Sequence, residues 1–396
     1  MALAILFSFF VLFSAMLVMT MFERELDRLA KDGLLRHIKS RRSAQGPVFN
    51  IEGRRYLNFS SNDYLGLASH PALREAAADA GEKFGFGAGA SRLLGGGCSL
   101  HERLEEITAA FKETEAALVF NSGYAANTGV IPSLASQSGV IFSDELNHAS
   151  IIDGCRLSSA EVFIFKHCDM DNLEGLLKKN RGRKKLVVTD SVFSMDGDIA
   201  PLPDLFSLCR RYGAVLYIDD AHGTGVLGNG RGALAHFGIA AEPWILQMGT
   251  FSKALGSFGA FVAADKNVID WITNTSRSFM FSTALPAPVI AASIKAIDLL
   301  KKSHGLLRKL WANRTMLAGG LRDIGYEERI SETPILTIRP GSLEKTLSLS
   351  NFLWEKGIYA PAIRPPTVRE ARVRITVTTV HKESHIRSLI ETLKKF

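Results

Sequence analysis

The stretch "WILQMGTFSKALGSFGAFVAAD", residues 244–265, holds two short apolar runs on either side of a small polar turn. The runs at 244–249 and 259–265 have the length and apolar content of buried β-strands. One lysine, Lys253, lies in the turn between them. An ammonium group buried between apolar segments is costly unless it is paired or neutralised. The stretch therefore predicts two strands of a sheet and a lysine with a specific chemical task.

Five more apolar runs precede this stretch, and each ends in polar residues and is followed by helix-like spacing. They cover 116–120, 139–144, 161–165, 185–190 and 214–220. Near-continuous apolar strands separated by helices are typical of a sheet that helices cover on both faces. One helix is clear, because Ser99 and Glu102 have the spacing of a capping box. We therefore expect an α/β fold with a mostly parallel sheet flanked by helices.

The length of the chain, 396 residues, is enough for two or three domains. After "STALPAP" at 282–288, a long helical segment at about 289–320 leads into a smaller unit of mixed helices and strands. The expected parts are an apolar segment at 1–22, an N-terminal arm at 23–58, a large domain at 59–288 and a small C-terminal α+β domain at 289–396.

The first 22 residues contain no charged side chain and are long enough to span a bilayer. They lack a basic start, which disfavours a cleaved signal peptide. One interpretation is a membrane anchor, with the basic residues at 36–42 holding the body on the cytoplasmic side. The other is a wrongly assigned start codon, with Met21 opening an amphipathic helix. Both interpretations place the main body in the cytoplasm.

The net charge of +7 favours anionic partners without selecting among them. The densest basic run, "KKNRGRKK" at 178–185, is expected to be a solvated turn, because no nucleic-acid-binding motif accompanies it. No pair of cysteines or histidines has the spacing of a metal site, so we expect no metal and reduced thiols. The four cysteines are Cys98, Cys155, Cys168 and Cys209.

Polar residues whose side chains could take part in binding or catalysis follow five of the predicted strands. In doubly wound sheets, ligands bind beyond the carboxyl ends of the strands, so these residues should meet at one edge. Taken singly, His148 resembles a structural histidine and Asp219 a helix cap, but lysine is rarely buried without a partner. The set comprises the small-residue turn "NSGYAAN" at 121–127, then His148, Ser194, Asp219, His222, Thr250 and Lys253.

One cofactor needs this whole set. Pyridoxal 5'-phosphate requires a lysine for a Schiff base, an acid for its pyridinium nitrogen, a nest of amides for its phosphate and a group over its ring. The sequence therefore predicts a pyridoxal-phosphate enzyme.

The chain from about Leu26 to its end resembles the α-oxoamine synthases, a family of fold-type-I pyridoxal-phosphate enzymes. The motifs that carry the resemblance, in chain order, are "SNDYLGL", "GAGASRLLGG", "LHERLE", "NSGYAAN", "NHASIIDG", "VFSMDGD", "DDAHGTGVLG", "TFSKALGS" and "AIRPPTV". A string of this length and order is highly specific for the family.

The resemblance implies a role for each matching residue. Lys253 would bind the cofactor and move the Cα proton, Asp219 would pair with the pyridinium nitrogen, and His148 would stack on the ring. His222 and Ser194 would bind the phenolic oxygen, while Gly123, Tyr124 and Thr250 would hold the phosphate. Family members are homodimers, so Ser282 and Thr283 would reach the phosphate of the partner subunit. Arg374 would clamp the amino-acid carboxylate, and Arg36 and Thr367 match positions that contact substrate.

Within the family, "DDAHGTGVLG" and "IRPPTV" resemble the branch that acts in biotin synthesis. This resemblance implies condensation of L-alanine with a pimeloyl thioester, on CoA or acyl carrier protein, with loss of CO₂ to give 8-amino-7-oxononanoate. Two positions depart from the pattern. The segment "REAR" at 369–372 replaces a longer loop, so the acyl-chain or carboxylate side of the site could differ, and Asp190 stands where a glutamate is common.

Two alternatives remain open. The first keeps the chemistry and changes the substrates, as in a serine palmitoyltransferase or a glycine C-acetyltransferase. The second is a non-catalytic family subunit, which would be expected to lose the lysine that Lys253 retains.

Overall fold

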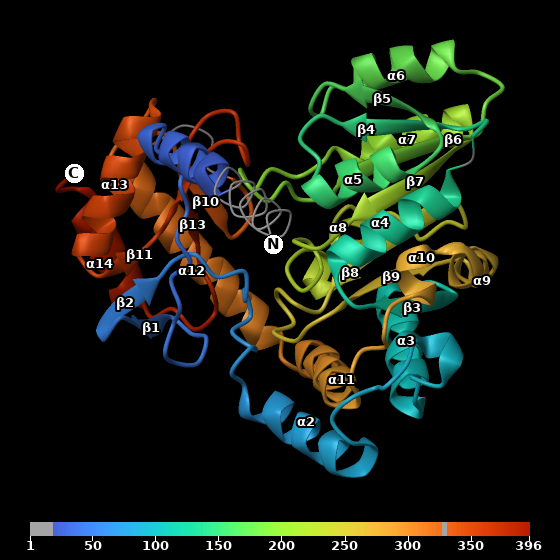
Figure 1. The fold of residues 1–396 in the computed structure, drawn as a ribbon, viewed down its shortest axis with the longest axis horizontal. Helices are drawn as coiled ribbons and strands as arrows, with labels where there is room; N and C mark the ends of the chain where they lie inside the picture. The colour runs from blue at the N-terminus through green and yellow to red at the C-terminus, as the bar shows by residue number, and fades with distance from the viewer. Residues whose placement is uncertain (1–18, 136, 327–330) are drawn as a thin grey trace, which may run out of the picture.

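The computed structural model describes residues 19–135, 137–326 and 331–396. The chain forms two lobes, a larger one built on a seven-stranded sheet and a smaller one that combines both ends of the chain (Figure 1). This architecture confirms the α/β class predicted from the sequence.

The seven-stranded sheet has the order β3-β9-β8-β7-β6-β4-β5. Strand β9 runs antiparallel to β3 and β8, and every other pair of neighbours in this sheet is parallel. All seven apolar runs of the sequence form these strands. Their bounds are β3 (Ala116–Phe120), β4 (Val140–Asp144), β5 (Glu161–Phe165), β6 (Lys185–Asp190), β7 (Ala214–Asp219), β8 (Ile245–Thr250) and β9 (Ala260–Ala264).

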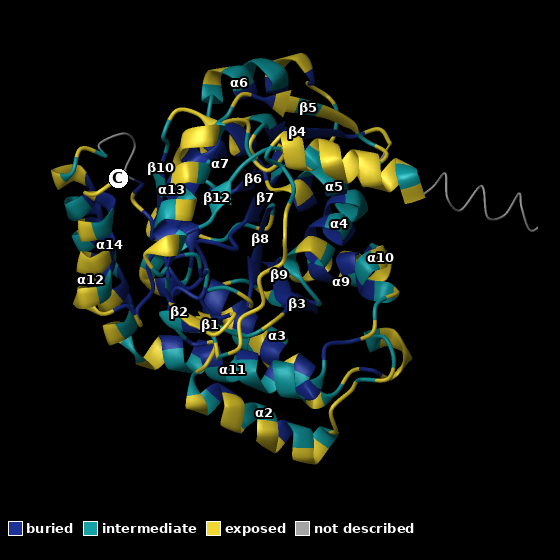
Figure 2. Cartoon of the chain, turned by 60° about the vertical axis from the view of Figure 1, so that its left-hand side comes forward, coloured by how far each residue is buried: buried dark blue, intermediate teal, exposed yellow. Residues whose placement is uncertain are grey.

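Helices cover both faces of this sheet, which explains why its central strands are apolar at nearly every position. Alternate residues of one strand enter different cores: Phe142 packs with one layer and Ile141 with the other. Figure 2 shows the central strands buried between helices whose outer faces are exposed. One layer contains α3 (Ser99–Lys112), α6 (Met170–Lys179), α7 (Leu202–Tyr212), α8 (Ala233–His236) and α11 (Ala287–Lys302). The other contains α4 (Gly123–Leu134), α5 (Ala149–Leu157), α9 (Lys266–Thr275) and α10 (Arg277–Met280).

The start of α3 differs from the prediction by one residue. The cap is Cys98, and the reciprocal bonds join Cys98 and His101 instead of Ser99 and Glu102. A thiol and an imidazole are uncommon capping groups, so the more usual Ser-x-x-Glu spacing one position later was misleading.

The helical segment expected at 289–320 is two helices, α11 and α12 (His304–Asp323), separated at Ser303. Helix α11 packs against α3 and against α2 (Pro71–Phe84) in the larger lobe. Helix α12 packs against α14 (Glu383–Leu393) in the smaller lobe. The passage between the lobes therefore lies at the break between these two helices.

The smaller lobe contains two three-stranded sheets with α12, α13 (Leu343–Glu355) and α14 packed around them. In one sheet, β13 (Arg372–Thr376) lies between β10 (Ile335–Ile338) and β12 (Ala362–Ile363). In the other, β2 (Arg54–Asn58) lies between β1 (Val48–Ile51) and β11 (Ile358–Tyr359). The predicted N-terminal arm therefore shares a sheet with the C-terminal part of the chain.

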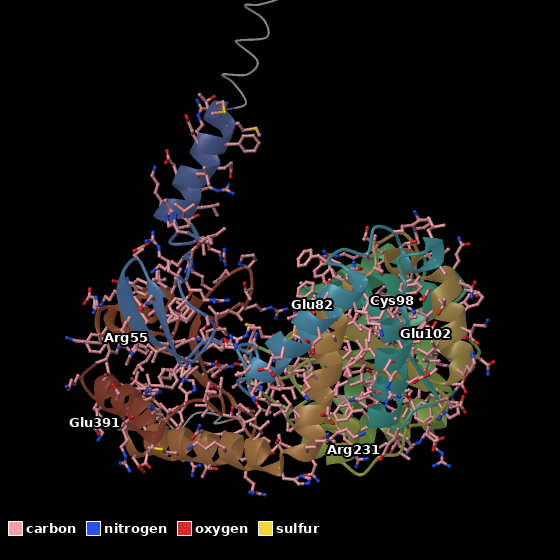
Figure 3. The ribbon with its side chains drawn as sticks, turned by 90° about the horizontal axis from the view of Figure 1, so that it is seen from below. Arg55, Glu82, Cys98, Glu102, Arg231 and Glu391 are labelled. Carbon is pink, nitrogen blue, oxygen red and sulfur yellow. The ribbon has the colours of Figure 1, made fainter. Side chains whose placement is uncertain are left out.

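Residues 19–31 form a helix that projects from the smaller lobe (Figure 3). Within the described ranges, no helix combines the length and apolar character needed to cross a bilayer. The apolar segment predicted at 1–22 lies mainly outside the described residues, so the anchor interpretation and the start-codon interpretation both stay predictions.

Candidate active site

The carboxyl ends of β4, β6, β7 and β8 bring the predicted chemical residues to one edge of the sheet. Lys253 follows β8, Asp219 ends β7, and Asp190 ends β6 directly opposite Asp219 in the strand register. His148 follows β4 and caps α5, and its imidazole interacts electrostatically with both Lys253 and Asp219. The structure thus gathers residues that are far apart in the sequence around one lysine.

Lys253 is half-buried, and its Nζ has no hydrogen-bond partner in the part of the chain that the structure describes. Desolvation lowers the pKa of Lys253, and Arg374 lowers it further, while Asp219 and Asp190 oppose this shift. A lowered pKa enlarges the neutral fraction of the amine, which is the form that acts as a nucleophile or base. The turn around the lysine requires Gly256, which has φ +63° and where a Cβ would lie 2.3 Å from the Ala68 amide nitrogen.

Asp219 is buried and held by two donors. Asn127 Nδ2 donates to Oδ2 at 2.8 Å, and the amide of Ala221 donates to Oδ1 at 3.0 Å. Asn127 is itself fixed, because it accepts from the Tyr217 hydroxyl at 2.8 Å and donates to Ser150 Oγ at 2.8 Å. Sequence reasoning assigned no role to this network, although Asn127 closes the quoted "NSGYAAN" motif.

His148 lies at the mouth of the site, where its side chain is exposed. Its amide donates to Asp190 Oδ2 at 2.7 Å, and Ser150 Oγ lies 2.7 Å from Nδ1. Desolvation by the surrounding protein lowers the pKa of His148, and Lys253 adds to this while Asp219 opposes it. These effects favour a neutral imidazole with a fixed orientation, which suits stacking against a flat ligand.

Asp190 is buried beside Asp219. Burial raises the pKa of Asp190 well above its ordinary value, and the neighbouring charge of Asp219 raises it further. A raised pKa enlarges the protonated fraction of Asp190, which lessens repulsion between the two acids. Through its bond to the His148 amide, Asp190 also fixes the start of α5.

His222 is buried, and its Nδ1 lies 2.8 Å from the hydroxyl of Tyr64. Burial lowers the pKa of His222 well below its ordinary value, and the charges of Lys253 and Arg374 add to this effect. A neutral His222 leaves one ring nitrogen as a donor and the other as an acceptor. Tyr64 lies in the quoted "SNDYLGL" motif, but its pairing with His222 could not be predicted from that motif.

The predicted anion nest lies at the start of α4. Ser122 Oγ accepts from the Ala125 amide at 3.1 Å, and the Ala126 amide donates to the Ser122 carbonyl. The amides of Gly123 and Tyr124 precede the first bond within the helix and so remain available for an anionic group.

Thr250 mainly orders the turn that carries Lys253. Its Oγ1 donates to the Gly259 carbonyl at 2.8 Å, and Ser252 Oγ lies 2.6 Å away. Ser252, which had no role in the sequence interpretation, is the more exposed of the two hydroxyls. The turn that carries Lys253 therefore also carries two neighbouring hydroxyls.

Arg374 on β13 joins the smaller lobe to the site. Its Nε donates to the Ser194 carbonyl at 2.6 Å, and its Nη2 donates to Asn62 Oδ1 at 3.0 Å and lies 3.4 Å from the Tyr64 hydroxyl. The guanidinium is buried next to the Tyr64–His222 pair. Ser194 contributes its carbonyl to this contact, whereas the prediction gave its hydroxyl the binding role.

The remaining predicted residues have contacts or pockets of their own. Arg36 donates to the Pro365 carbonyl at 2.9 Å, and Thr283 is exposed beside Ser282 with its carbonyl accepting from Asn121. Thr367 lines a cavity of about 860 Å³ that also reaches Ser194 and Asn147. The structure thus places Thr367 at a cavity bordering the site, and it places Arg36 in a separate surface pocket.

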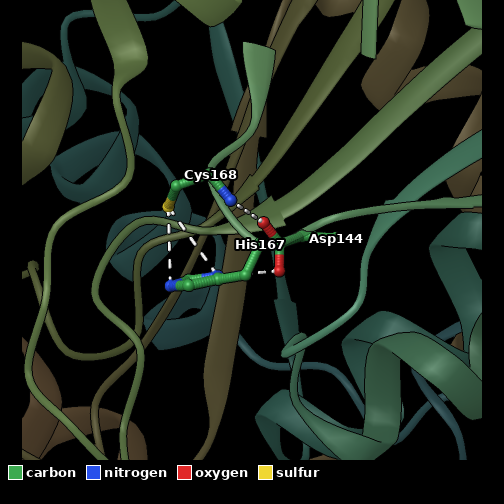
Figure 4. Close-up of side chains that lie close together, drawn as sticks. All are labelled: Asp144, His167 and Cys168. Atoms are coloured by element: carbon green, nitrogen blue, oxygen red, sulfur yellow. Dashed lines mark hydrogen bonds and ion pairs between the residues drawn. The ribbon is translucent and has the colours of Figure 1, made fainter. Parts of the chain in front are cut away.

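A second polar cluster lies beyond the ends of β4 and β5 (Figure 4). His167 bonds to Asp144 through Nδ1 at 3.0 Å and to Asp198 through Nε2 at 2.7 Å, and Cys168 Sγ lies 3.6 Å from Nε2. Burial lowers the pKa of His167, but the two carboxylates more than offset this and raise it to about 12. His167 therefore bridges the loops of Asp144 and Asp198, and the ligand atoms of Asp144, His167 and Cys168 also lie close enough together to hold a metal ion. All four cysteines of the chain are free thiols.

The donor set fits pyridoxal phosphate. A lysine amine without a hydrogen-bond partner faces a buried carboxylate, and two helix-start amides and two hydroxyls lie on neighbouring loops. These groups match an aldehyde, a pyridinium nitrogen and a phosphate respectively.

Comparisons with known proteins agree with this geometry. The family described as aminotransferase class I and II matches residues 54–393. A putative 8-amino-7-oxononanoate synthase of Thermodesulfovibrio yellowstonii is 49% identical over 369 residues, covering 93% of this chain and 95% of the relative. An 8-amino-7-oxononanoate synthase of Geobacter sulfurreducens is 48% identical over 377 residues, with coverage of 94% and 96%.

Solved structures are also similar. A serine palmitoyltransferase variant from S. paucimobilis, with PLP and myriocin bound, matches with a TM-score of 0.89 at 29% identity, covering 94% of this chain and 96% of that one. An 8-amino-7-oxononanoate synthase from Francisella tularensis has a TM-score of 0.75 at 28% identity, with coverage of 86% and 97%. The resemblance found in the sequence motifs is confirmed. The chain belongs to the class I and II aminotransferase family, among relatives named 8-amino-7-oxononanoate synthase.

Proposed function

We propose that the protein is a pyridoxal-phosphate enzyme that condenses L-alanine with a pimeloyl thioester and releases CO₂, giving 8-amino-7-oxononanoate for biotin synthesis. The observation that carries the proposal is Lys253, a lysine of lowered pKa set among Asp219, His148 and His222. The names of the relatives support the choice of substrates.

Pyridoxal phosphate, when bound, supplies an electron sink that stabilises negative charge on the substrate Cα. Lys253 would hold it covalently, Asp219 would accept from its pyridinium nitrogen, and the amides of Gly123 and Tyr124 would bind its phosphate. The bonds from Asn127 and the Ala221 amide keep the Asp219 carboxylate oriented for this contact. The neutral imidazole of His148 would cover one face of the ring.

The chain's own groups account for the remaining tasks. Arg374 would bind the carboxylate of L-alanine through the guanidinium N–H groups that do not bond to Ser194 and Asn62, until the carboxylate leaves as CO₂. The Lys253 amine would accept the Cα proton of L-alanine, because its lowered pKa enlarges the neutral fraction that can act as a base. A C–C bond then forms at the acyl carbonyl as the C–S bond breaks, and the thiol carrier departs.

We further propose that the working unit is a homodimer. Thr283 is exposed close to Phe281, which is 70% exposed. Leu94, at the end of the short 3-10 helix Arg92–Leu94 that follows the partner of Thr283 in a β-bridge, is 81% exposed. Apolar side chains this exposed favour burial against a second copy. In such a dimer, Ser282 and Thr283 would reach the phosphate site of the partner subunit.

The direct test replaces Lys253 with alanine. Lys253→Ala should lower the rate of 8-amino-7-oxononanoate formation by ~10³-fold or more and abolish the visible absorbance of lysine-bound cofactor. Lys266→Ala, which removes a surface lysine paired with Asp270 on α9, is the matched control and should keep both properties. A Lys253→Ala protein with normal turnover would refute the assignment.

A second candidate keeps the chemistry and changes the substrates, because serine palmitoyltransferase structures match with a TM-score of 0.89. The purified protein should be assayed with L-alanine, glycine and L-serine, each with pimeloyl-, acetyl- and palmitoyl-CoA. Turnover confined to L-serine and palmitoyl-CoA would overturn the biotin assignment. A colourless protein that never takes up pyridoxal phosphate would instead favour a non-catalytic subunit.

A further inference from the structure

The cavity of about 860 Å³ beside the site lies between loops of the two lobes. Its lining includes Ser194, whose carbonyl accepts from Arg374 at the proposed site of the amino-acid carboxylate. Apolar side chains such as Met195 and Val368 also line it. This lining suits an acyl chain whose methylene groups contact apolar side chains close to the proposed site.

Three arginines line the part of the cavity formed by the smaller lobe, and two of them already form ion pairs within the protein. Asp196 accepts from Arg339 at 2.7 Å and also from Arg372, which is buried. Both arginines therefore link the two lobes through one carboxylate, and a ligand would have to break that link to bind them.

Arg369, the third arginine, is placed differently. Its side chain is 88% exposed, and its only ion pair within the described residues is to Glu145 Oε2 at 3.6 Å. That distance exceeds a hydrogen bond, and ion pairs this exposed contribute little stability. Glu145 has a separate task, because its Oε1 accepts from the His167 amide at 3.0 Å. Arg369 can therefore release Glu145 and bind the carboxylate of a ligand, because breaking this exposed ion pair costs little free energy.

We propose that Arg369 recognises the distal carboxylate of a dicarboxylic acyl chain lying in this cavity. The inference rests on the proposed function, since a pimeloyl group ends in a carboxylate that an unsubstituted acyl chain lacks. A guanidinium binds a carboxylate through two parallel hydrogen bonds, which gives both affinity and selectivity. Arg369 is thus a specificity residue for the acyl chain.

The test compares two thioesters that differ only in this carboxylate, pimeloyl-CoA and heptanoyl-CoA, each with L-alanine and the loaded enzyme. Arg369→Gln should lower kcat/KM for pimeloyl-CoA by about 10- to 100-fold, mainly through KM, while heptanoyl-CoA changes by less than about 3-fold. Arg369→Lys should lie between, because it keeps the charge and loses the paired geometry. Titration calorimetry without L-alanine should give the same order of affinities.

Two variants serve as controls. Arg103→Gln removes an exposed arginine on α3 that is paired with Glu106 outside the cavity, and it should leave the ratio of kcat/KM for the two thioesters unchanged. Glu145→Gln keeps an oxygen that can accept from the His167 amide but removes the competing charge, so it should lower KM for pimeloyl-CoA.

The outcomes separate this inference from the proposed function. Equal losses for both thioesters in Arg369→Gln would indicate a contact with the CoA carrier and would overturn the inference, as would no loss for either. Both results leave the condensation itself standing. A wild-type enzyme that fails to condense L-alanine with pimeloyl-CoA would overturn the proposed function and this inference together.

Discussion

At the scale of single residues, the site is a set of chemical groups held by neighbours that have no chemical role of their own. Lys253 could be predicted, because a lysine between two apolar strands is unusual in itself. The role of Asn127 could not be predicted, because its bond to Asp219 joins residues 92 positions apart and forms only after α4 packs on the sheet. The role of Tyr64 could not be predicted for the same reason, because its partner His222 lies on a different loop.

Replacing Asn127 with alanine tests this support. Asn127→Ala removes the 2.8 Å bond to Asp219, so the carboxylate should lose its orientation toward the pyridinium nitrogen. We expect pyridoxal-phosphate affinity to fall about 10-fold, in line with the loss of one hydrogen bond to a charged group. Equilibrium dialysis against the cofactor measures this directly.

The matched control is Asn313, another buried asparagine that donates two hydrogen bonds, to the Thr378 and His381 carbonyls in the smaller lobe. Asn313→Ala should lower the unfolding temperature without changing cofactor affinity. If both variants bound the cofactor equally well, Asn127 would have only a packing role.

At the scale of elements, His167 ties three loops of the large sheet together. It follows β5, and its two nitrogens bond to Asp144 at the end of β4 and to Asp198 in the loop after β6. The strands themselves could be predicted from apolar runs, because burial on both faces leaves a strong pattern. The bridge formed by His167 could not be predicted from the sequence, because it depends on which strands become neighbours in the sheet. The break between α11 and α12 at Ser303 could not be predicted either, because it arises where the two helices pack on different lobes.

The stabilisation that His167 provides should depend on pH in a definite direction. Its pKa in the folded state is raised to about 12 from an ordinary value of 6.5. The folded protein therefore holds a proton that the unfolded chain releases, so the contribution is complete below pH 6.5 and declines as the pH rises toward 12. Between pH 6.5 and 9, the unfolding temperature of the wild type should fall more steeply than that of His167→Gln.

Differential scanning fluorimetry at matched ionic strength measures both curves. Parallel curves for the two proteins would show that His167 is not protonated in the folded state. A metal-dependent rise in the wild-type unfolding temperature would point instead to a metal at the Asp144, His167 and Cys168 cluster.

At the scale of the whole molecule, the loop after β6 joins the two lobes. Asp196 binds Arg339 and Arg372, and the Gly197 carbonyl accepts from Ser331 and Thr333. Gly197 has φ +77°, and a Cβ there would lie 2.5 Å from Ser331 Oγ. The quoted "VFSMDGD" motif predicted a binding role for this loop, whereas its contacts across the lobes became visible only in three dimensions.

Asp196→Asn should destabilise the protein by about 2–4 kcal/mol, because it leaves the buried Arg372 guanidinium without its counter-charge. Burial raises the pKa of Asp196, but Arg339 and Arg372 more than offset this and lower it below its ordinary value of 3.8. The stabilisation is therefore present above pH 3.8 and lost as the pH falls further. Urea unfolding at pH 7 and at pH 3 measures both effects.

Glu106→Gln, which removes the exposed partner of Arg103, should change stability by less than about 0.5 kcal/mol. An Asp196→Asn protein as stable as Glu106→Gln at pH 7 would contradict the importance of this link.

The pairing of β2 with β11 has a consequence for the order in which the chain folds. Leu57 pairs with Ile358, and Phe59 packs into a core made otherwise of residues after 316. During synthesis on the ribosome, one edge of β2 therefore stays unpaired until β11, near the end of the chain, has been made. The larger lobe can form during this interval, because its sheet is complete once β9 has emerged. The smaller lobe should therefore be the last part to fold during synthesis and the part that most needs protection from aggregation.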